Sequence, residues 1–394
     1  MLINCRYIVK RLTNWSFFRW DHLAVCAMIG LFGWLLILIT SKVSIFDPVK
    51  AAFNDFSMTD VFFEIQNNGY SVQDDDIVIV DMTDLRTRDE IAQTITDIKS
   101  CQPKVLGVDL IFERPSSNKM DDVALVSAID SGNCQQIWSC KLREYDPERK
   151  AFKDCLYSFF HDINNYVWGY TNYQQKRMGG VTRKTSQRQN LNDSIAYSLP
   201  YLLACYYVGK LPQEELVNER DIIYSNVEFY TLKSSEVLQH KDMLRDKLVL
   251  LGTMNEEADM HFSPLGKMPG VKVIAYSILS YMKHGEITRM SRWTSLIITF
   301  FLCYIAAWMG YKIQQWNSVF NSILTKFFIF GLCTVVIGLA LYVFITNDYY
   351  VDLLYPLLGL ALEESARGLY AKIIKWFVGK KKIGFLKSSI YADS

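Results

Sequence analysis

The chain has 394 residues, 50% of them apolar, 14% aromatic, and a formal net charge of +1 at pH 7. These averages suit an ordinary folded protein and exclude a chain with an extreme charge balance, while the length allows one to three domains. The apolar residues are strongly clustered, so their positions along the chain are more informative than their number.

Four apolar segments are expected to cross a membrane. The first is uncharged from Leu23 to Thr40, which approaches the ~20 residues that a helix needs to cross ~30 Å of hydrocarbon. No small-x-small cleavage pattern follows it, which favours an uncleaved anchor over a secretory signal. The fourth is weaker, because its uncharged core, Leu353 to Leu362, rises only ~15 Å as a helix. We predict transmembrane helices at residues 23–42, 292–310, 327–346 and 350–369.

Lysine and arginine residues gather on the cytoplasmic side of short membrane-flanking segments. Residues 1–22 have four basic residues against one acid, the loop 311–326 has Lys312 and Lys326 with no acid, and the tail 370–394 has six lysines. We therefore place all three in the cytoplasm, with both termini inside. An even number of crossings is then required, so the fourth segment is expected to cross despite its charges.

Residues 43–291 are then extracytoplasmic. They contain 27 Lys plus Arg and 35 Asp plus Glu, and this acidic balance argues against a nucleic-acid partner. Two readings stay open for their five cysteines: up to two disulfides with one thiol left over, or buried reduced thiols acting as small apolar residues. These cysteines are Cys101, Cys134, Cys140, Cys155 and Cys205.

The same region has the pattern of an α/β fold. Asp76–Asp81 and Lys104–Phe112 are apolar runs typical of buried strands, and a helical pattern lies between them. A βαβ unit of this kind predicts a mostly parallel sheet sandwiched by helices. Further helices are expected at Asp121–Ile129, at Asp193–Val208, where Pro200 should kink or divide the helix, and at Gly270–Lys283; a further strand is expected at Lys247–Gly252.

Three stretches carry a resemblance to a known family: DIVIVDMTD, PKVLGVDLIF and DKLVLLGTMNEEADMHFSPLGKMPGVKVIAYSIL. With one apolar segment before and three after, they resemble the type-two CHASE domain, the cyclase- and histidine-kinase-associated sensory extracellular module. The resemblance extends from about Phe46 to Leu369 and implies a bacterial inner-membrane receptor with a periplasmic sensor domain.

The sequence departs from the family pattern in two places. A histidine usually follows the Pro-Gly-Val of the closing motif, whereas this chain has Lys272 to Ala275 there. Many relatives continue into an output domain, whereas this chain stops soon after its last apolar segment. We therefore expect a separate cytosolic or membrane protein to receive any signal.

Ligands of open α/β sheets bind beyond the carboxyl ends of the strands. Acidic side chains that follow the predicted strands make a candidate ligand site, and their alternative role is helix capping or turn closure. The candidates are Asp81, Asp84, Asp109, Glu113, Asp259 and His261. No enzyme motif, cofactor motif or zinc spacing is present in the sequence, so we expect neither catalysis nor a bound metal.

The fourth apolar segment ends in charged residues, which are costly inside a membrane. Glu363 and Arg367 are four residues apart, so they share a helix face and can pair. Together with Glu364 they are candidates for coupling the outer domain to the cytoplasm; the alternative is that they lie at the membrane interface. The helix beyond them is basic and amphipathic, which suits binding to anionic lipid or to a cytosolic partner.

Two functional classes follow from these patterns. The first is a sensory membrane subunit that passes a periplasmic stimulus to a separate partner, with a homodimer as the default assembly. The second is a structural or assembly subunit whose periplasmic domain binds another protein. A transporter is a distant third, because four spans leave little room for a substrate path.

Overall fold

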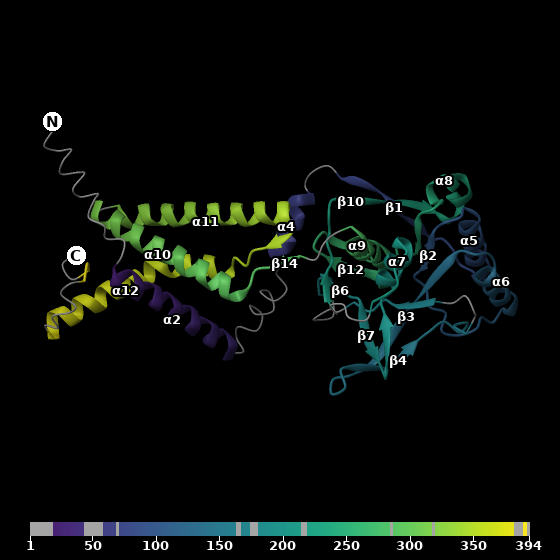
Figure 1. Cartoon of the computed structure of the whole chain (residues 1–394), viewed down its shortest axis with the longest axis horizontal. Helices are drawn as coiled ribbons and strands as arrows, with labels where there is room; N and C mark the ends of the chain where they lie inside the picture. The colour runs from purple at the N-terminus through teal and green to yellow at the C-terminus, as the bar shows by residue number, and fades with distance from the viewer. Residues whose placement is uncertain are drawn as a thin grey trace. The chain divides into compact units, whose positions relative to one another are not determined.

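The computed structural model describes residues 19–42, 58–67, 71–162, 167–173, 180–213, 219–283, 287–316, 320–381 and 389–391. The chain divides into two compact units, and Figure 1 colours the chain by residue number from the N-terminus to the C-terminus. We call Thr59–Glu286 the α/β unit, and Met1–Met58 with Ile287–Ser394 the helical unit.

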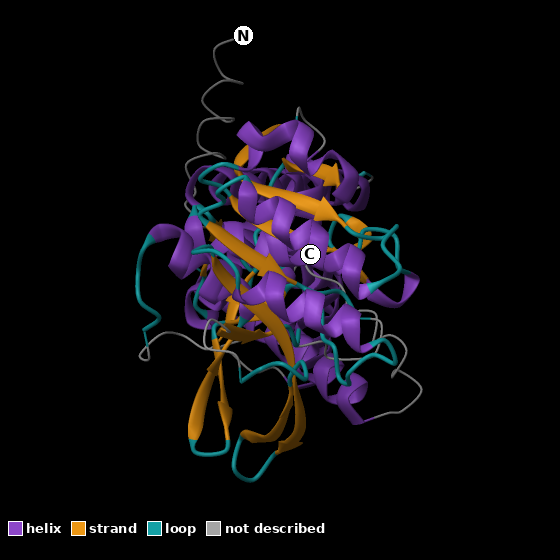
Figure 2. Ribbon diagram, turned by 90° about the vertical axis from the view of Figure 1, so that its right-hand side faces the viewer, coloured by secondary structure: helices purple, strands orange, loops and turns teal. Residues whose placement is uncertain are grey.

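The α/β unit is built on a nine-stranded mixed sheet in the described residues (Figure 2). Its main part is parallel, in the order β10 (Val227–Lys233), β1 (Val72–Asp81), β11 (Leu248–Gly252), β2 (Val105–Val108), β3 (Gln135–Asp146) and β5 (Val167–Tyr170). The far half of β3 pairs antiparallel with β4 (Ala151–Leu156), beyond which lie β7 (Arg188–Leu191) and β8 (Ser194–Tyr197). The expected α/β fold with a mostly parallel sheet is confirmed.

Helices cover both faces of the parallel part, because its strands are apolar on both sides. One face carries α5 (Arg88–Ser100), α6 (Lys119–Asp130), the 3-10 helix η2 (Ser234–His240) and α8 (Lys241–Leu244). The other carries α7 (Leu199–Val208) and α9 (Gly270–Met282). Smaller elements are α4 (Met58–Asn67), η3 (Glu257–Asp259) and two short antiparallel pairs. One pair is β12 (Met260–Ser263) with β13 (Gly266–Pro269), and the other is β6 (Lys184–Ser186) with β9 (Glu219–Asp221).

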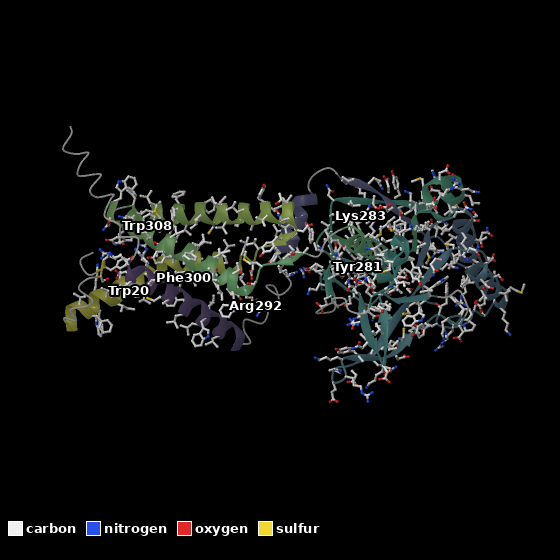
Figure 3. All side chains as sticks on the ribbon, viewed as in Figure 1. Trp20, Tyr281, Lys283, Arg292, Phe300 and Trp308 are labelled. Carbon is white, nitrogen blue, oxygen red and sulfur yellow. The ribbon has the colours of Figure 1, made fainter. Side chains whose placement is uncertain are left out.

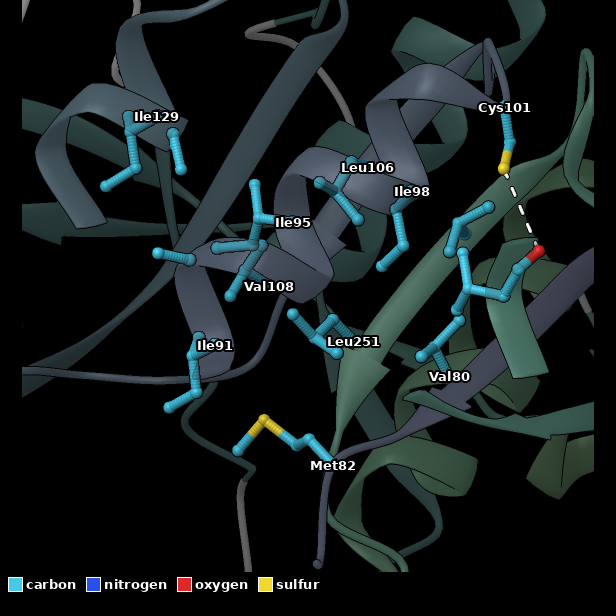
Figure 4. Close-up of a cluster of buried hydrophobic side chains, with 14 of the residues drawn as sticks. Val80, Met82, Ile91, Ile95, Ile98, Cys101, Leu106, Val108, Ile129 and Leu251 are labelled. Carbon is cyan, nitrogen blue, oxygen red and sulfur yellow. Dashed lines mark hydrogen bonds between the residues drawn. The ribbon is translucent and has the colours of Figure 1, made fainter. Parts of the chain in front are cut away.

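The core under α5 follows from the helical spacing of three isoleucines. Ile91, Ile95 and Ile98 are buried and point toward the strands in Figure 4, where Val108 and Leu251 are also labelled. The helix starts with a capping box, in which the Thr87 side chain accepts from the backbone N–H of Glu90 and the Glu90 carboxylate accepts from that of Thr87. The structure therefore confirms the helical pattern expected between the first two predicted strands.

The predicted helix at Asp193–Val208 is wrong in its first half. Ser194–Tyr197 forms strand β8, and the helix begins only at Leu199. Pro200 lies in the first helical turn, where its fixed φ is favourable and its missing N–H costs no hydrogen bond. The proline therefore starts the helix rather than kinking it.

Gly169 on β5 lies against the start of α7, where no side chain fits. A Cβ at this position would lie 2.6 Å from the Leu199 Cα, and backbone atoms there cannot move aside easily. We expect Gly169→Ala to destabilise the α/β unit by about 1–3 kcal/mol, the usual cost of overpacking. Thermal unfolding of the full chain checks this, with Gly368→Ala as control, since a Cβ at Gly368 meets nothing within 4 Å. Equal stability of the two variants would contradict the close contact.

The five cysteines of the α/β unit are free thiols in the structure. Four of them, Cys101, Cys140, Cys155 and Cys205, are buried, and Cys134 is partly exposed. Of the two readings left open by the sequence, the structure has the reduced one.

The helical unit consists of α2 (Trp20–Lys42), α10 (Arg292–Trp316), α11 (Asn321–Asn347) and α12 (Leu354–Lys381), with a short parallel pair β14 (Thr288–Arg289) and β15 (Tyr349–Tyr350). In the described residues, α10 and α11 are long and apolar enough to cross a membrane. Figure 3 labels Phe300 and Trp308 on α10. The apolar part of α2, Trp20–Leu36, is shorter, and α12 combines the fourth predicted segment with the first part of the basic tail. The crossings by all four segments stay predictions, and α10 and α11 are candidate spans by their length and composition.

Candidate functional site

Two adjoining cavities lie at the carboxyl edge of the parallel strands. Asp109 directly follows β2, and Thr253 and Thr171 follow β11 and β5. Each cavity has a volume of about 260 Å³, and both are lined by Asp109 and Asp259. The first, which we call the acidic cavity, is completed by Leu110, Ile111, Ser139, Thr253 and Glu256. The second, the mixed cavity, is completed by Lys141, Thr171, Asn172, Tyr173, His261, Gly270 and Ile274.

Asp259 is held beside the first residue of α9. A Cβ on Gly270 would lie only 2.6 Å from the Asp259 Oδ1 atom, so the carboxylate approaches the helix as closely as glycine permits. The N-terminal end of a helix carries a partial positive charge, which favours an anion at this position. The site therefore depends on a glycine that begins a helix as well as on its acids.

His261 lies between Asp259 and an aromatic ring. Its Nε2 atom is 3.7 Å from the Asp259 Oδ1 atom, and its ring meets that of Tyr173 edge-on, with centroids 5.8 Å apart. The Tyr173 hydroxyl lies 3.4 Å from the Ser277 Oγ atom on α9. These contacts hold one wall of the mixed cavity against the helix.

Asp109 has an unusual protonation equilibrium. Burial, and then the negative charge of Asp259, raise the pKa of Asp109 from 3.8 to about 7, while the Ser139 hydroxyl, and then His261 and Lys141, act in the opposite direction. The Asp109 carboxyl group therefore changes charge close to neutral pH. In the described part of the chain, no group of three or more His, Cys, Asp or Glu residues is arranged to hold a metal ion.

Three of the predicted candidates do not line either cavity. The Asp81 Oδ1 atom accepts hydrogen bonds from the backbone N–H groups of Thr83 (2.9 Å) and Met254 (3.2 Å), so it ties the end of β1 to the loop after β11. Glu113 pairs with Arg143 at 3.2 Å on the surface, and Asp84 is exposed. Asp81 has the turn-closing role that was the alternative for all the acids.

Other residues of the site were not predicted. Lys141 lies on β3, and Thr171, Asn172 and Tyr173 follow β5. Neither strand was expected, so the sequence did not indicate that polar residues there would reach the site. The apolar run Ile137–Trp138 and the aromatic run Val167–Tyr170 were the available signals for them.

A second cluster of functional candidates lies in the helical unit. The Glu363 side chain is fully buried, and Arg367 donates from Nε to its Oε1 atom at 2.9 Å. Arg367 also donates from Nη1 to Gln314 on α10 at 3.2 Å. Glu364 accepts from the Ser322 hydroxyl of α11 at 2.6 Å. The three predicted coupling residues thus tie α12 to two other helices, and we call these five residues the membrane network.

Comparison with protein-family models matches residues 28–310 to the model described as CHASE2 domain. The match covers most of the chain and confirms the family resemblance seen in its strand and closing motifs. Neither the curated proteins nor the solved structures gave a match.

Proposed function

Because the chain belongs to the CHASE2 domain family, we propose that it is a sensory membrane protein whose α/β unit binds a small polar ligand at the carboxyl edge of its sheet. Membership of a sensory-domain family supports a role in sensing or signalling. The location of the binding site, the class of ligand and the route of the signal are our proposal.

The observation that carries this proposal is the pair of adjoining cavities. Ligand sites of open α/β sheets lie at this edge, and they combine a concave surface with a few convergent polar groups. Asp109, Asp259, His261 and Lys141 supply such groups around the two cavities. Their combined size suits a metabolite of few atoms rather than a large ligand.

The binding site is connected to the membrane helices through the polypeptide chain. Asp259 contacts Gly270, the first residue of α9; α9 ends at Met282, and α10 begins at Arg292. A shift of α9 on binding would therefore pull on the start of α10. The membrane network would pass the change on to α12, because Arg367 of α12 donates a hydrogen bond to Gln314 of α10 and also bonds to Glu363 of its own helix.

In this proposal the protein lies in the bacterial inner membrane as a homodimer, with the α/β unit in the periplasm and both ends of the chain in the cytoplasm. A separate cytosolic or membrane protein reads the change in the helices. The basic end of α12, with exposed Lys372 and Lys375, is the part we assign to that partner or to anionic lipid.

Ligand-dependent thermal unfolding of the full chain in mild detergent tests the binding function. The probes are amino acids, organic acids, sugars, polyamines and Ca²⁺, each added separately. We expect at least one probe to raise the melting temperature of the wild type, since a ligand at 100 times its dissociation constant adds about 2.7 kcal/mol. The same probe should have little effect on Asp259→Asn.

Two outcomes count against a sensor of small ligands. The first is that none of the probes stabilises the protein. The second is that the best probe stabilises Asp259→Asn as much as it stabilises the wild type. If the chain then purifies from native membranes with a stoichiometric periplasmic protein, the assembly role replaces the sensory one.

A further inference from the structure

The charges of the two cavities are distributed unequally. The acidic cavity is lined by Asp109, Asp259 and Glu256 and by no lysine, arginine or histidine. The mixed cavity shares the two aspartates and adds Lys141 and His261. For a molecule that occupies both cavities, the ionisable groups at one end are therefore all carboxyl groups, whereas the other end adds the Lys141 ammonium group and the His261 ring.

We propose that the ligand is a small zwitterion, with a protonated amine in the acidic cavity and a carboxylate in the mixed cavity, as amino acids have. This inference rests on the proposed function, since it names the ligand class of the same site.

The amine end follows from a cavity that has three acids and no lysine, arginine or histidine in its lining. In the described residues, no salt bridge is formed by Asp109 or Glu256, and Asp259 makes a long contact to His261. The charges of Asp109 and Asp259 repel each other, which favours the protonated form of Asp109. An ammonium group placed between them would bind both carboxylates and remove that repulsion.

The position of the ligand carboxylate follows from the hydrogen bonds that the polar groups of the mixed cavity already make. Asn172 is engaged with β3: its Oδ1 atom accepts from the Leu142 N–H at 2.8 Å and its Nδ2 donates to the Leu142 carbonyl at 2.9 Å. The Thr171 hydroxyl donates to the Cys140 carbonyl at 3.4 Å. Lys141, in contrast, forms no salt bridge within the described residues and lines the cavity. Its ammonium group is the cation that a ligand carboxylate would meet.

Other small ligands complement the site less well. A dicarboxylate would place a second anion beside Asp109 and Asp259, and a polyamine would place a second cation beside Lys141. A neutral sugar would leave the unpaired charges without partners, which is costly once water is displaced. A molecule with one charge of each sign matches both cavities.

Isothermal titration of the full chain in mild detergent tests the ligand class. Each common L-amino acid is titrated first, and the tightest is compared with its desamino acid and with its decarboxylated amine. Both analogues are expected to bind at least about tenfold more weakly, the loss expected for a hydrogen bond to a charged group.

Two variants separate the ends of the ligand. Asp259→Asn should weaken the amino acid and the amine but change the desamino acid little. Lys141→Met should weaken the amino acid and the desamino acid but leave the amine unchanged. Glu113→Gln, an acid outside both cavities, is the matched control and should bind the amino acid as the wild type does.

The results distinguish this inference from the proposed function. If an organic acid, a sugar or Ca²⁺ binds in an Asp259-dependent way while no amino acid does, the zwitterion is wrong and the sensory site stands. Equal binding of the amino acid and both analogues also overturns it. If none of these probes binds, both proposals fail.

Discussion

Replacing Arg367 with methionine is expected to destabilise the helical unit by about 3–5 kcal/mol, the usual cost of leaving a buried charge without its partner. Glu363 is fully buried and its Oε1 atom accepts a 2.9 Å hydrogen bond from Arg367, while its Oε2 atom has no hydrogen-bond partner in the described residues. The substitution also removes the bond to Gln314, which holds α12 against α10. Denaturation of the full chain in micelles, followed by helical circular dichroism, measures the loss.

Two further variants identify the cause of that loss. Lys375→Met removes an exposed charge from the same helix and should change stability by less than about 0.5 kcal/mol. The double variant Glu363→Gln with Arg367→Met removes both charges and should recover part of the stability, because no carboxylate then remains buried and unpaired. A single Arg367→Met variant as stable as the wild type would show that the pair lies in water and that the interface reading is correct.

The parts of the fold that were predicted correctly have a strong local signal. Apolar runs at Ile77–Val80 and Leu248–Leu251 and the isoleucine spacing of α5 follow from burial alone. Their pairing was not predictable in the same way. β11 lies between β1 and β2, although it comes far later in the chain, because buried parallel strands look alike in sequence and nothing local selects their neighbours.

The missed strands are those with a weak local signal. β8 is only four residues long, and its run Ser194–Tyr197 continues into an apolar helix, so the helical pattern seemed to begin too early. The far half of β3, from Lys141 to Asp146, is largely exposed, with Leu142 buried, so it carries little apolar pattern that would mark a strand. These short elements depend on tertiary pairing rather than on their own propensity.

The candidate site shows the same division between local and distant information. Asp109, Asp259 and His261 were found because they follow or flank recognisable strands, and the structure brings them together. Asp81 has the same sequence context, yet its carboxylate is used by nearby backbone N–H groups. The structural role of Asp81 differs from the site role of Asp109 because the N–H groups of Thr83 and Met254 lie beside Asp81. The spacing of residues in the sequence does not show where these N–H groups lie. Lys141 was missed because its strand was not expected.

Asp109→Asn is expected to stabilise the α/β unit at alkaline pH and to have little effect in acid. The pKa of Asp109 is raised from 3.8 to about 7 in the folded protein. Between these values the unfolded chain has released this proton and the folded chain retains it, so stability falls as pH rises through this window. The full penalty is present above pH 7 and amounts to at most about 4 kcal/mol, at 1.36 kcal/mol per pKa unit. Asparagine removes the charge and with it the penalty.

The quantity to measure is the difference in unfolding free energy between Asp109→Asn and the wild type, from about pH 4.5 to about pH 8. It should grow across this range as the wild type loses stability. Asp259→Asn provides the sharper control, because Asp259 is the second cause of the shift: in its background the pKa of Asp109 falls and the gain from Asp109→Asn shrinks. A difference that is independent of pH would mean that Asp109 is ionised throughout this range. Water would then screen the charges of Asp109 and Asp259 from each other, and the pKa of Asp109 would not be raised.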